Sequence, residues 1–543
     1  MMTSNYLTNF FVYIKKHVDD TYTFTNTVSL SPSTVKDKVN EMLEKNIPIP
    51  QKSFDWFRTI VKYVCDKGIW LQFNISTGLW YNVGEKSPLD AILGDYFQYI
   101  YDEAVKVGDK VHMGYASFWF SNANKISALI KKLSTGIQFK IDHATEIVDR
   151  TFGLRYIPVY SGDGMNSHNC LVDINEGVTA FNSRIVRPSE VQDLLLTQRA
   201  PQPIDLDESH EPKLWLQLID EYMLHDPVKV SYFYDVLGYM MSPYNANQAV
   251  IYWYGPEGRN GKSTLLKVLR DILGDAYVAD IKSEFLYSRP PVGYKADDTL
   301  AGTEGRSLYV VNELDERQDM STKHLKDLTE GGIDDSGNRL PTPIRPSYSK
   351  QYNICVSGIP LIVANNLIRM NEYANLAPIF KRLILVRFDY IIKKEDPTIP
   401  SRLAKEYPQI QRWLYANYFR FKAKCKATGH TIKTLPKPLE WGEQTKEYME
   451  DTNTIQQFWD ECITVTPNDR LAQPNLYKMY KTYCEFIGKR PIAQKGSDGF
   501  DKKIKPYTAG YATKKSTHGT IFVYGISASD NYNDVYATPY KTR

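Results

Sequence analysis

Ten consecutive residues in the middle of the chain have the types and spacing of a phosphate-binding loop: Gly255, Pro256, Glu257, Gly258, Arg259, Asn260, Gly261, Lys262, Ser263 and Thr264. Glycines let successive backbone N–H groups point at phosphate oxygens, because no Cβ stands in the way. Lys262 supplies a cation for the β- and γ-phosphates of a nucleoside triphosphate, and the Ser263 hydroxyl is a ligand for Mg²⁺. These residues predict a triphosphate-binding site, with a glycine-rich surface turn as the plain alternative.

The spacing departs from the usual pattern at one point. Counting back from Gly261, the first glycine of G-x-x-x-x-G-K falls on Pro256, so Gly255 comes one residue early. We therefore expect a slightly longer loop with Gly258 in the turn. Gly255 is interpreted as a tolerated insertion, and residues 260–263 as the essential cluster.

Three polar positions downstream have companion chemistry. Glu313 follows the apolar run 307–311 and can bind Mg²⁺ and polarise a water molecule, in a strand expected beside the one that leads into the loop. Asn365 closes a second apolar run and can contact a γ-phosphate or the attacking water. Arg382 precedes a third run and can stabilise phosphoryl charge. Taken singly, the three also fit an acidic turn, a turn-forming amide and a surface charge.

The elements that must position these side chains can be read from the apolar pattern. The run 249–254 predicts a strand before the loop, and the apolar spacing at 265–273 predicts a helix after it. Apolar strands alternate with helices from 249 to about 392, which is typical of an α/β layer architecture.

Composition sets outer limits on the chain. Its 543 residues suggest about three or four domains, and a net charge of +3 does not by itself indicate a nucleic-acid partner. The six cysteines contain no Cys-x-x-Cys pair, which argues against a zinc ribbon and a disulfide framework. We see no signal peptide and no apolar stretch of the roughly 20 residues that cross a bilayer. A soluble protein of the cytoplasm, with no membrane partner, is expected.

Proline-bearing links divide the rest of the chain. Residues 200–207 and 435–438 are interpreted as such links, and the Asp205-Leu206-Asp207 motif as a solvated part of the first. The expected units are an N-terminal region of unknown role, a domain preceding the α/β unit, the α/β unit itself, a helical connector and a C-terminal domain, at residues 1–70, 71–245, 246–395, 396–438 and 439–543.

The order of the four motifs resembles that of superfamily 3 helicases, the compact ring helicases of viruses, phages and plasmids. Residues 325–332 and 365–370 are further similar to stretches of the poxvirus and phage/plasmid primase–helicase family. The resemblance covers roughly residues 70–530. Departures are the acid displaced to Asp334, isoleucine in place of proline at Ile368, and Asn312 where many relatives have a second acid. No strand with paired carboxylates precedes the helicase part, so no primase domain is recognised.

The resemblance implies an AAA+-like P-loop core, a mainly α-helical N-terminal region and a winged-helix-like C-terminal domain. It implies ATP and Mg²⁺ as cofactors, with Lys262 and the loop amides on the phosphates, Ser263 and Glu313 on the metal, and Asn365 as γ-phosphate sensor. It also implies a homo-oligomeric ring, expected to be a hexamer, in which Arg382 acts on the neighbouring subunit. Single-stranded and forked DNA, and a separate primase or polymerase, are the expected partners.

Candidate DNA contacts lie in two basic, aromatic stretches. One is the interval between the acidic strand and the sensor strand, where this helicase class has a channel hairpin, and the other is the C-terminal unit. The expected residues are Arg339, Arg345, Tyr348 and Lys350 in the first and Lys502 and Lys503 in the second. An exposed loop or a solvated charged face has the same composition.

Other functions remain open at this point. They are a replication initiator that binds origin DNA and uses ATP as an assembly switch, an RNA-directed viral nucleoside triphosphatase, and a P-loop kinase of a small metabolite.

Overall fold

The structure is a computed structural model. It describes residues 61–74, 77–84, 154–160, 165–174, 180–288, 290–315, 318–330, 340–368, 377–452, 454–487, 499–516 and 519–536, together with a few isolated positions. Among these residues no helix is long and apolar enough to cross a membrane.

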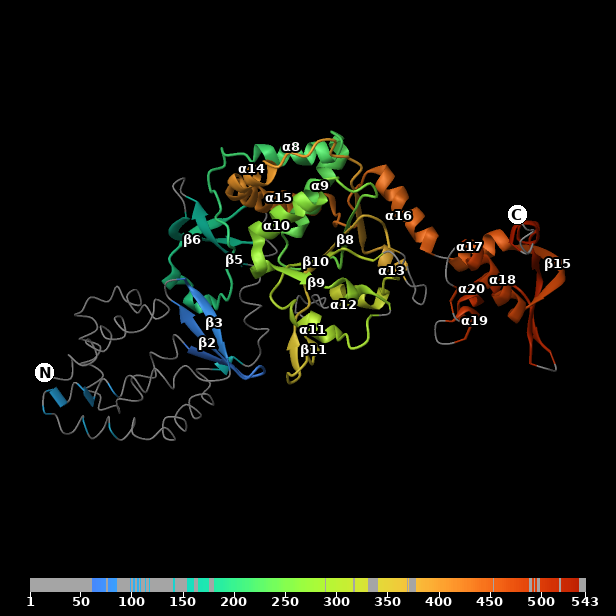
Figure 1. Ribbon diagram of the computed structural model, residues 1–543, viewed down its shortest axis with the longest axis horizontal. Helices are drawn as coiled ribbons and strands as arrows, with labels where there is room; N and C mark the ends of the chain where they lie inside the picture. Colours follow the sequence, from blue (N-terminus) through green and yellow to red (C-terminus); the bar gives the residue numbers. More distant parts are fainter. Residues whose placement is uncertain are drawn as a thin grey trace.

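A five-stranded parallel sheet forms the centre of the molecule (Figure 1). Its strands are β8 (Val250–Tyr254), β9 (Val278–Ile281), β10 (Leu308–Asn312), β13 (Ile359–Ala364) and β14 (Leu383–Arg387), in the order β14-β8-β13-β10-β9. Because all five strands are parallel, their carboxyl ends meet at one edge. The α/β layer architecture predicted for 249–392 is confirmed.

Both faces of the sheet are covered, as the continuous apolar strands require. Successive side chains of β8 enter two different cores: Ile251 and Trp253 one, Tyr252 and Tyr254 the other. The first core also contains residues of α10 (Lys262–Tyr277), and the second residues of η5 (Ser283–Leu286), α11 (Ala296–Ala301), α12 (Thr322–Glu330) and α13 (Ala377–Phe380).

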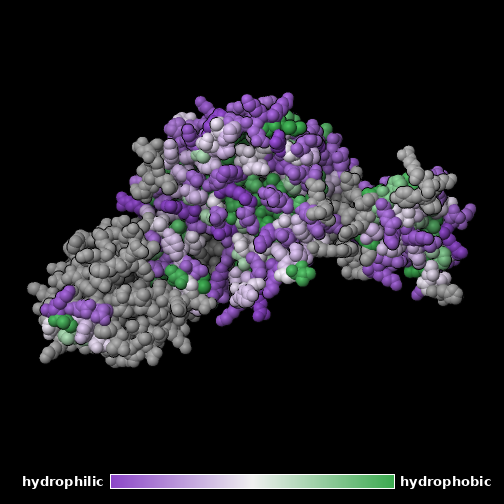
Figure 2. Space-filling model, viewed as in Figure 1, coloured by the Kyte–Doolittle hydropathy of each residue, from purple (hydrophilic) through white to green (hydrophobic). Residues whose placement is uncertain are grey.

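The first core extends beyond the α/β unit in both directions of the sequence. It contains side chains of α8 (Lys213–Tyr222), α9 (Pro227–Met240), α14 (Ile399–Lys405) and α15 (Tyr407–Thr428). These helices lie over one side of the central sheet in Figure 1, and the outer surface of this layer is largely hydrophilic in Figure 2. One hydrophobic core therefore crosses the positions 245 and 395 at which borders were expected.

The link at 200–207 differs from its prediction as a solvated segment. Ile204 is buried and bridges to Val159, and Asp205 is only 4% exposed. The Asp205 carboxylate accepts hydrogen bonds from Gln409 Nε2 and the His210 ring, while Asp207 is exposed. The polar Asp205 of this segment is therefore a buried carboxylate whose hydrogen-bonding capacity is satisfied inside the fold.

Strands dominate the described residues between 61 and 200, and the mainly α-helical N-terminal region stays a prediction for the residues outside the described part. One sheet contains β1 (Val61–Val64), β2 (Ile69–Asn74), β3 (Leu79–Gly84) and β4 (Lys140–Ile141) in the order β3-β2-β1-β4, and so spans position 70. A second contains β5 (Leu154–Tyr160), β6 (Met165–Asp173) and β7 (Ser183–Val186), followed by η4 (Pro188–Leu194). Residues 1–60 lie outside the described part.

The C-terminal unit has its own core and begins after α16 (Leu439–Thr452). Tyr448 of α16 packs edge-on against Phe380, with ring centroids 5.2 Å apart, and Gln444 accepts a hydrogen bond from the Tyr254 hydroxyl at 2.7 Å. Helix α16 thus belongs to the central domain at one end and leads to the C-terminal unit at the other (Figure 1). That unit contains α17 (Thr454–Cys462), β15 (Ile463–Ala472), α18 (Gln473–Phe486), α19 (Phe500–Lys503), α20 (Lys505–Thr508), β16 (Thr513–Lys515), β17 (Ile521–Ala528) and η6 (Tyr532–Tyr536).

Candidate functional site

The loop between β8 and α10 is a tight turn held by one backbone hydrogen bond within it and one to the end of β13. The Gly255 N–H donates to the Asn365 carbonyl at 3.0 Å, and the Gly258 N–H donates to the Gly255 carbonyl at 3.3 Å. Gly258 and Gly261 have φ angles of 65° and 82°, which favour glycine. Helix α10 begins at Lys262, so its first unpaired N–H groups face the loop. This geometry is suited to binding an anion.

Gly255 is a packed part of this turn, which differs from its interpretation as a tolerated insertion. A Cβ at Gly255 would lie 2.0 Å from Asn260 Nδ2 and 2.5 Å from the Phe388 carbonyl oxygen. A Cβ at Gly258 would meet nothing within 4 Å. The fold therefore leaves no room for a side chain at Gly255, the glycine that falls outside the expected spacing.

Lys262 is buried within the loop, with only 4% of its surface exposed. Its Nζ donates to Asn260 Oδ1 at 2.7 Å and to the Gly255 carbonyl at 3.2 Å. Burial lowers the pKa of Lys262 to about 8, because removal of the ammonium from water disfavours its charged form. An anionic ligand would supply the missing counter-charge.

Asn260 connects the loop to the end of β14. Its side-chain amide donates to the Gly255 carbonyl at 3.1 Å and to the Phe388 carbonyl at 3.3 Å, while its oxygen accepts from Lys262. Asn260 is 3% exposed, so these bonds satisfy an otherwise costly buried amide. It fixes both the loop and the ammonium.

Tyr222, at the end of α8, supports the loop from behind and was not found by sequence reasoning. A Cβ at Gly261 would lie 2.3 Å from Tyr222 Cε2, so the ring lies directly against this glycine. The ring also packs on Tyr390 at 5.6 Å, and its hydroxyl bonds the Thr264 side chain. Burial raises the pKa of Tyr222 to about 12. A residue 39 positions before Gly261 gives no local signal of this contact.

Glu313 and Asn365 lie at the same carboxyl edge of the sheet as the loop. In the parallel register Tyr254 pairs with Ala364, and Val363 pairs with Asn312. Strand β13 therefore lies between β8 and β10, so the expectation that the acidic strand lies beside β8 is wrong by one strand. Glu313 and Asn365 are both exposed. Glu313 also has a positive φ of 57°, an uncommon backbone state for a residue other than glycine.

No group of three or more His, Cys, Asp or Glu side chains is placed to hold a metal ion in the described part of the chain. Ser263 and Glu313 can offer one hydroxyl and one carboxylate. This donor set fits Mg²⁺, which usually takes few protein ligands and completes its shell with water and phosphate oxygens.

Arg382 lies at the opposite, amino edge of the sheet. Its carbonyl accepts a hydrogen bond from the Val250 N–H at 2.8 Å, at the beginning of β8, and its Nη1 donates to Thr329 Oγ1 at 2.8 Å. Burial and, second, the charge of Arg382 lower the pKa of Lys433, so a second cation lies nearby. The structure brings Lys262, Glu313 and Asn365 to one edge and separates Arg382 from them.

A hairpin carries three of the predicted DNA contacts. Strands β11 (Thr342–Ile344) and β12 (Tyr352–Ile354) pair antiparallel, and the turn between them contains Arg345, Tyr348 and Lys350. Tyr348 is fully exposed and has a φ of 60°. Arg339 lies outside the described residues.

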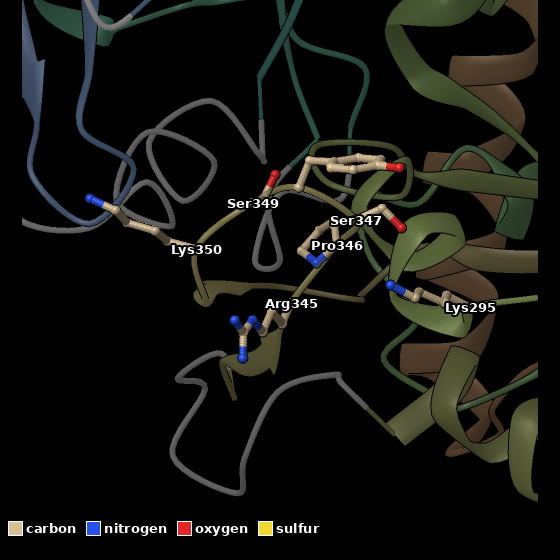
Figure 3. Close-up of a pocket in the computed structure, with 7 residues that line it drawn as sticks. Lys295, Arg345, Pro346, Ser347, Ser349 and Lys350 are labelled. Carbon is tan, nitrogen blue, oxygen red and sulfur yellow. The ribbon is translucent and has the colours of Figure 1, made fainter. Parts of the chain in front are cut away.

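The hairpin turn is held by the start of α11. Asp298 accepts from the Ser347 N–H at 2.5 Å and from its hydroxyl at 2.7 Å, and Asp297 accepts from the Arg345 N–H at 2.9 Å. Residues 345–350 and Lys295 line a surface hollow of about 610 Å³ (Figure 3). Lys295 was missed because it precedes the hairpin by about 50 residues. The hollow combines cations, hydroxyls and an aromatic ring.

Lys502 and Lys503 lie on the one-turn helix α19, with Lys502 exposed and Lys503 half-buried. The side chain of neighbouring Phe500 fills the core of the C-terminal unit. The two lysines thus lie on a surface element of that unit, distant in sequence from the loop.

Comparisons with known proteins give low sequence identities. No family model matches the chain. It is 22% identical, over 274 residues, to the putative primase C962R of two African swine fever virus isolates, Warthog/Namibia and Pig/Kenya. The match covers 47% of this chain and 27% of those proteins, so the chain spans about a quarter of the length of these relatives.

Two solved structures are similar over long stretches at low TM-score. The apo structure of the NrS-1 C-terminal region has a TM-score of 0.38 and 12% identity, and covers 86% of this chain and 96% of that one. The JCV helicase, crystallised with a small molecule, has a TM-score of 0.21 and 11% identity, and covers 51% of this chain and 66% of that one. The curated relatives are described as putative primases, and the second of the two solved structures as a helicase.

Proposed function

We propose that this protein is an ATP-dependent DNA helicase of a phage or mobile element, which forms a ring and moves along one strand. The observation that carries the proposal is the division of the site residues between two edges of one sheet. Lys262, Glu313 and Asn365 meet at the carboxyl edge, and Arg382 lies at the amino edge. A complete site then needs two copies of the chain.

At the carboxyl edge, the loop amides and Lys262 bind the β- and γ-phosphates of ATP. Ser263 and Glu313 would hold Mg²⁺, which would neutralise charge on the phosphates. Glu313 also accepts a proton from the water that attacks the γ-phosphorus, as the bond to the ADP oxygen breaks. Asn365 hydrogen-bonds the γ-phosphate or that water, which distinguishes ATP from ADP.

At the amino edge, Arg382 approaches the site of the adjacent subunit and stabilises charge on the transferred phosphoryl group. A closed homo-oligomer, with a hexamer as the expected form, gives each site one such arginine. The P-loop core in this proposal is AAA+-like. Its support is the parallel sheet together with the sequence resemblance, which also makes a primase or polymerase an expected partner.

In this proposal, ATP hydrolysis moves the β11–β12 hairpin, which contacts the DNA strand. Arg345, Lys350 and Tyr348 project a mixture of cations and an aromatic ring, which suits binding of phosphates and bases along a single strand. Because α11 holds the turn through Asp297 and Asp298, a shift of α11 would move the hairpin with it.

Unwinding of a forked DNA duplex with ATP and Mg²⁺ tests the proposal. Wild type should unwind, Lys262→Ala should neither bind ATP tightly nor unwind, and Glu313→Gln should bind ATP but not hydrolyse it. Equal unwinding by wild type and Lys262→Ala would refute the proposal. Stimulation of the ATPase by single-stranded RNA but not by single-stranded DNA would move the substrate from DNA to RNA.

A further inference from the structure

The outer face of the small C-terminal sheet contains an organised cluster of cations and aromatic rings. The sheet has the order β15-β17-β16, and its register pairs Arg470 with Tyr524 and Lys514 with Phe522. Phe522 and Tyr524 are two residues apart on β17 and so share a face. Val523 between them is buried in the core of the unit, which places the pair on the outer face.

The cations of this cluster lie over the rings. The Arg470 guanidinium carbon is 4.8 Å from the centroid of Phe522 and 5.7 Å from that of Tyr524, and Lys514 Nζ is 5.8 Å from the Tyr524 centroid. Arg470 Nη1 also donates to the Tyr524 hydroxyl at 3.1 Å. Arg470 and Lys514 are exposed, and both rings are half-buried. The rings and this hydrogen bond restrain the guanidinium at the surface.

We propose that this face, defined by Arg470, Lys514, Phe522 and Tyr524, binds single-stranded nucleic acid in the absence of ATP. This site is additional to those used in the proposed helicase function. A guanidinium that rests on a ring presents its other face to a base and its edge to a phosphate. Lys514 lies on the other side of β17 from Arg470, two strand spacings of ~4.8 Å away, and takes a second phosphate. The ligand class is therefore a phosphodiester strand with unpaired bases.

A single strand fits this face better than a duplex. Duplex DNA is read mainly by helices or ribbons that enter a groove, whereas flat sheets with aromatic side chains take splayed bases. The face is an open sheet surface, and its two aromatic rings lie on β17 between a cation on β15 and a cation on β16. The charge is local, since the whole chain has a net charge of only +3.

Binding of fluorescent oligo(dT) to the full-length chain, measured by anisotropy without nucleotide, tests this site. Arg470→Gln with Lys514→Gln should weaken binding about five- to tenfold. The slope of log K against log salt should become less steep by about 1.4, since each lost single-strand phosphate contact accounts for about 0.7. Arg470→Lys, which keeps the charge but loses the planar guanidinium, should weaken binding with little change of slope.

Lys515→Gln is the matched control. Lys515 is the next residue on β16, is exposed, and lies on the other side of the strand from Lys514. It should bind oligo(dT) like wild type. The same measurements in a Lys350→Gln background remove part of the hairpin's contribution, so that a small effect at the C-terminal face is not masked.

Unchanged oligo(dT) binding by the Arg470 and Lys514 double variant in both backgrounds would overturn the site. An equal loss in Lys515→Gln would reduce the effect to general charge, and a loss confined to blunt duplex DNA would overturn the single-strand assignment. Circular dichroism of Lys514→Gln, which changes only an exposed side chain, guards against unfolding. The assay contains no ATP, so its result is independent of the ATPase proposal.

Discussion

Lys262 and Arg382 lie at opposite edges of the same parallel sheet, joined by the paired strands β8 and β14. The Arg382 carbonyl accepts from Val250 at the beginning of β8, and the Phe388 N–H donates to Tyr254 at its end, next to the loop. Five paired residues separate the two ends, which at ~3.3 Å per residue is about 16 Å. Arg382 therefore lies about the length of a strand away from the loop of its own chain.

The first prediction follows from this separation. Lys262→Ala and Arg382→Ala should each lose ATPase activity when assayed alone. An equimolar mixture should regain up to about a quarter of wild-type activity, because one random interface in four joins an intact Lys262 to an intact Arg382. A coupled ATPase assay during subunit mixing measures this recovery.

Two observations would contradict action between subunits. One is a mixture with no activity above that of the separate variants, although both assemble to the wild-type size. The other is full ATPase activity of Arg382→Ala alone. Arg382→Lys serves as a control for folding, because it keeps a donor for the Thr329 hydroxyl.

The second prediction concerns pH. Burial lowers the pKa of Lys262 to about 8 in the free protein, and a bound triphosphate should raise it again because it favours the charged form. The affinity for ATP should therefore fall as pH rises above 8, by up to about tenfold per pH unit until the pKa of the bound state is reached. Calorimetric titration at pH 7, 8 and 9 measures this slope.

Lys262→Met supplies the comparison, because its weaker binding lacks this titration and should change little over the same range. Stability of the free protein should move in the opposite sense. The unfolded chain binds the Lys262 proton more tightly between pH 8 and about 10.5, so the wild type should gain stability relative to Lys262→Met as pH rises there. A parallel pH slope for ATP in both proteins would contradict the assignment of the charge to Lys262.

Much of the central sheet could be predicted from sequence, because buried parallel strands are continuous apolar runs. The run 249–254 became Val250–Tyr254, and 361–364 became Ile359–Ala364. The helix predicted at 265–273 extends over Lys262–Tyr277. The position of Glu313 and Asn365 at strand ends followed directly, since a polar residue after an apolar run marks the end of a strand.

The order of the strands in the sheet could not be predicted, because an apolar run does not indicate which other strands it pairs with. For this reason β10 was expected beside β8, where β13 lies. Long-range contacts also leave no local signal in the sequence. Examples are the packing of Tyr222 against Gly261, the hydrogen bond between Asp298 and Ser347, and the burial of Asp205 next to Gln409 of α15. The hydrophobic core extends across positions 245 and 395 because α8, α9, α14 and α15 contribute side chains to the same core as β8 and α10.

The third prediction compares two glycines of one loop. Gly255→Ala should lower the free energy of unfolding by about 1–3 kcal/mol, the range for overpacking, because its Cβ would displace Asn260 and the Phe388 carbonyl. It should also weaken ATP binding, since Asn260 holds Lys262. Gly258→Ala should lower the free energy of unfolding only through the strain of alanine at a positive φ, about 1–2 kcal/mol. A stiffer unfolded chain should offset ~0.4–1 kcal/mol of this loss.

Urea denaturation and ATP titration of both variants measure this difference. Near-wild-type ATP binding is expected for Gly258→Ala, because its added methyl group meets nothing within 4 Å. Equal losses in the two variants, or a larger loss at Gly258, would mean that the packing around Gly255 does not shape the loop.

The fourth prediction uses the sign of an effect at the hairpin. Asp298 is an acid beside the cationic turn, so its removal should strengthen binding of single-stranded DNA if charge alone matters. If Asp298 instead positions the turn through the Ser347 N–H and hydroxyl, Asp298→Ala should weaken binding, by about three- to tenfold. We expect the weakening. These hydrogen bonds lower the pKa of Asp298, so it stays charged and the tether is lost only as pH falls through that lowered pKa.

Ser347→Ala separates the two roles, because it removes the hydroxyl bond while the backbone bond and the carboxylate charge remain. It should weaken oligo(dT) binding less than Asp298→Ala and leave the salt dependence unchanged. Lys350→Gln should instead make the salt slope less steep by about 0.7, as expected for one phosphate contact. Tighter binding by Asp298→Ala would show that the carboxylate acts as a repelling charge, and the hairpin would then need no support from α11 to hold a strand.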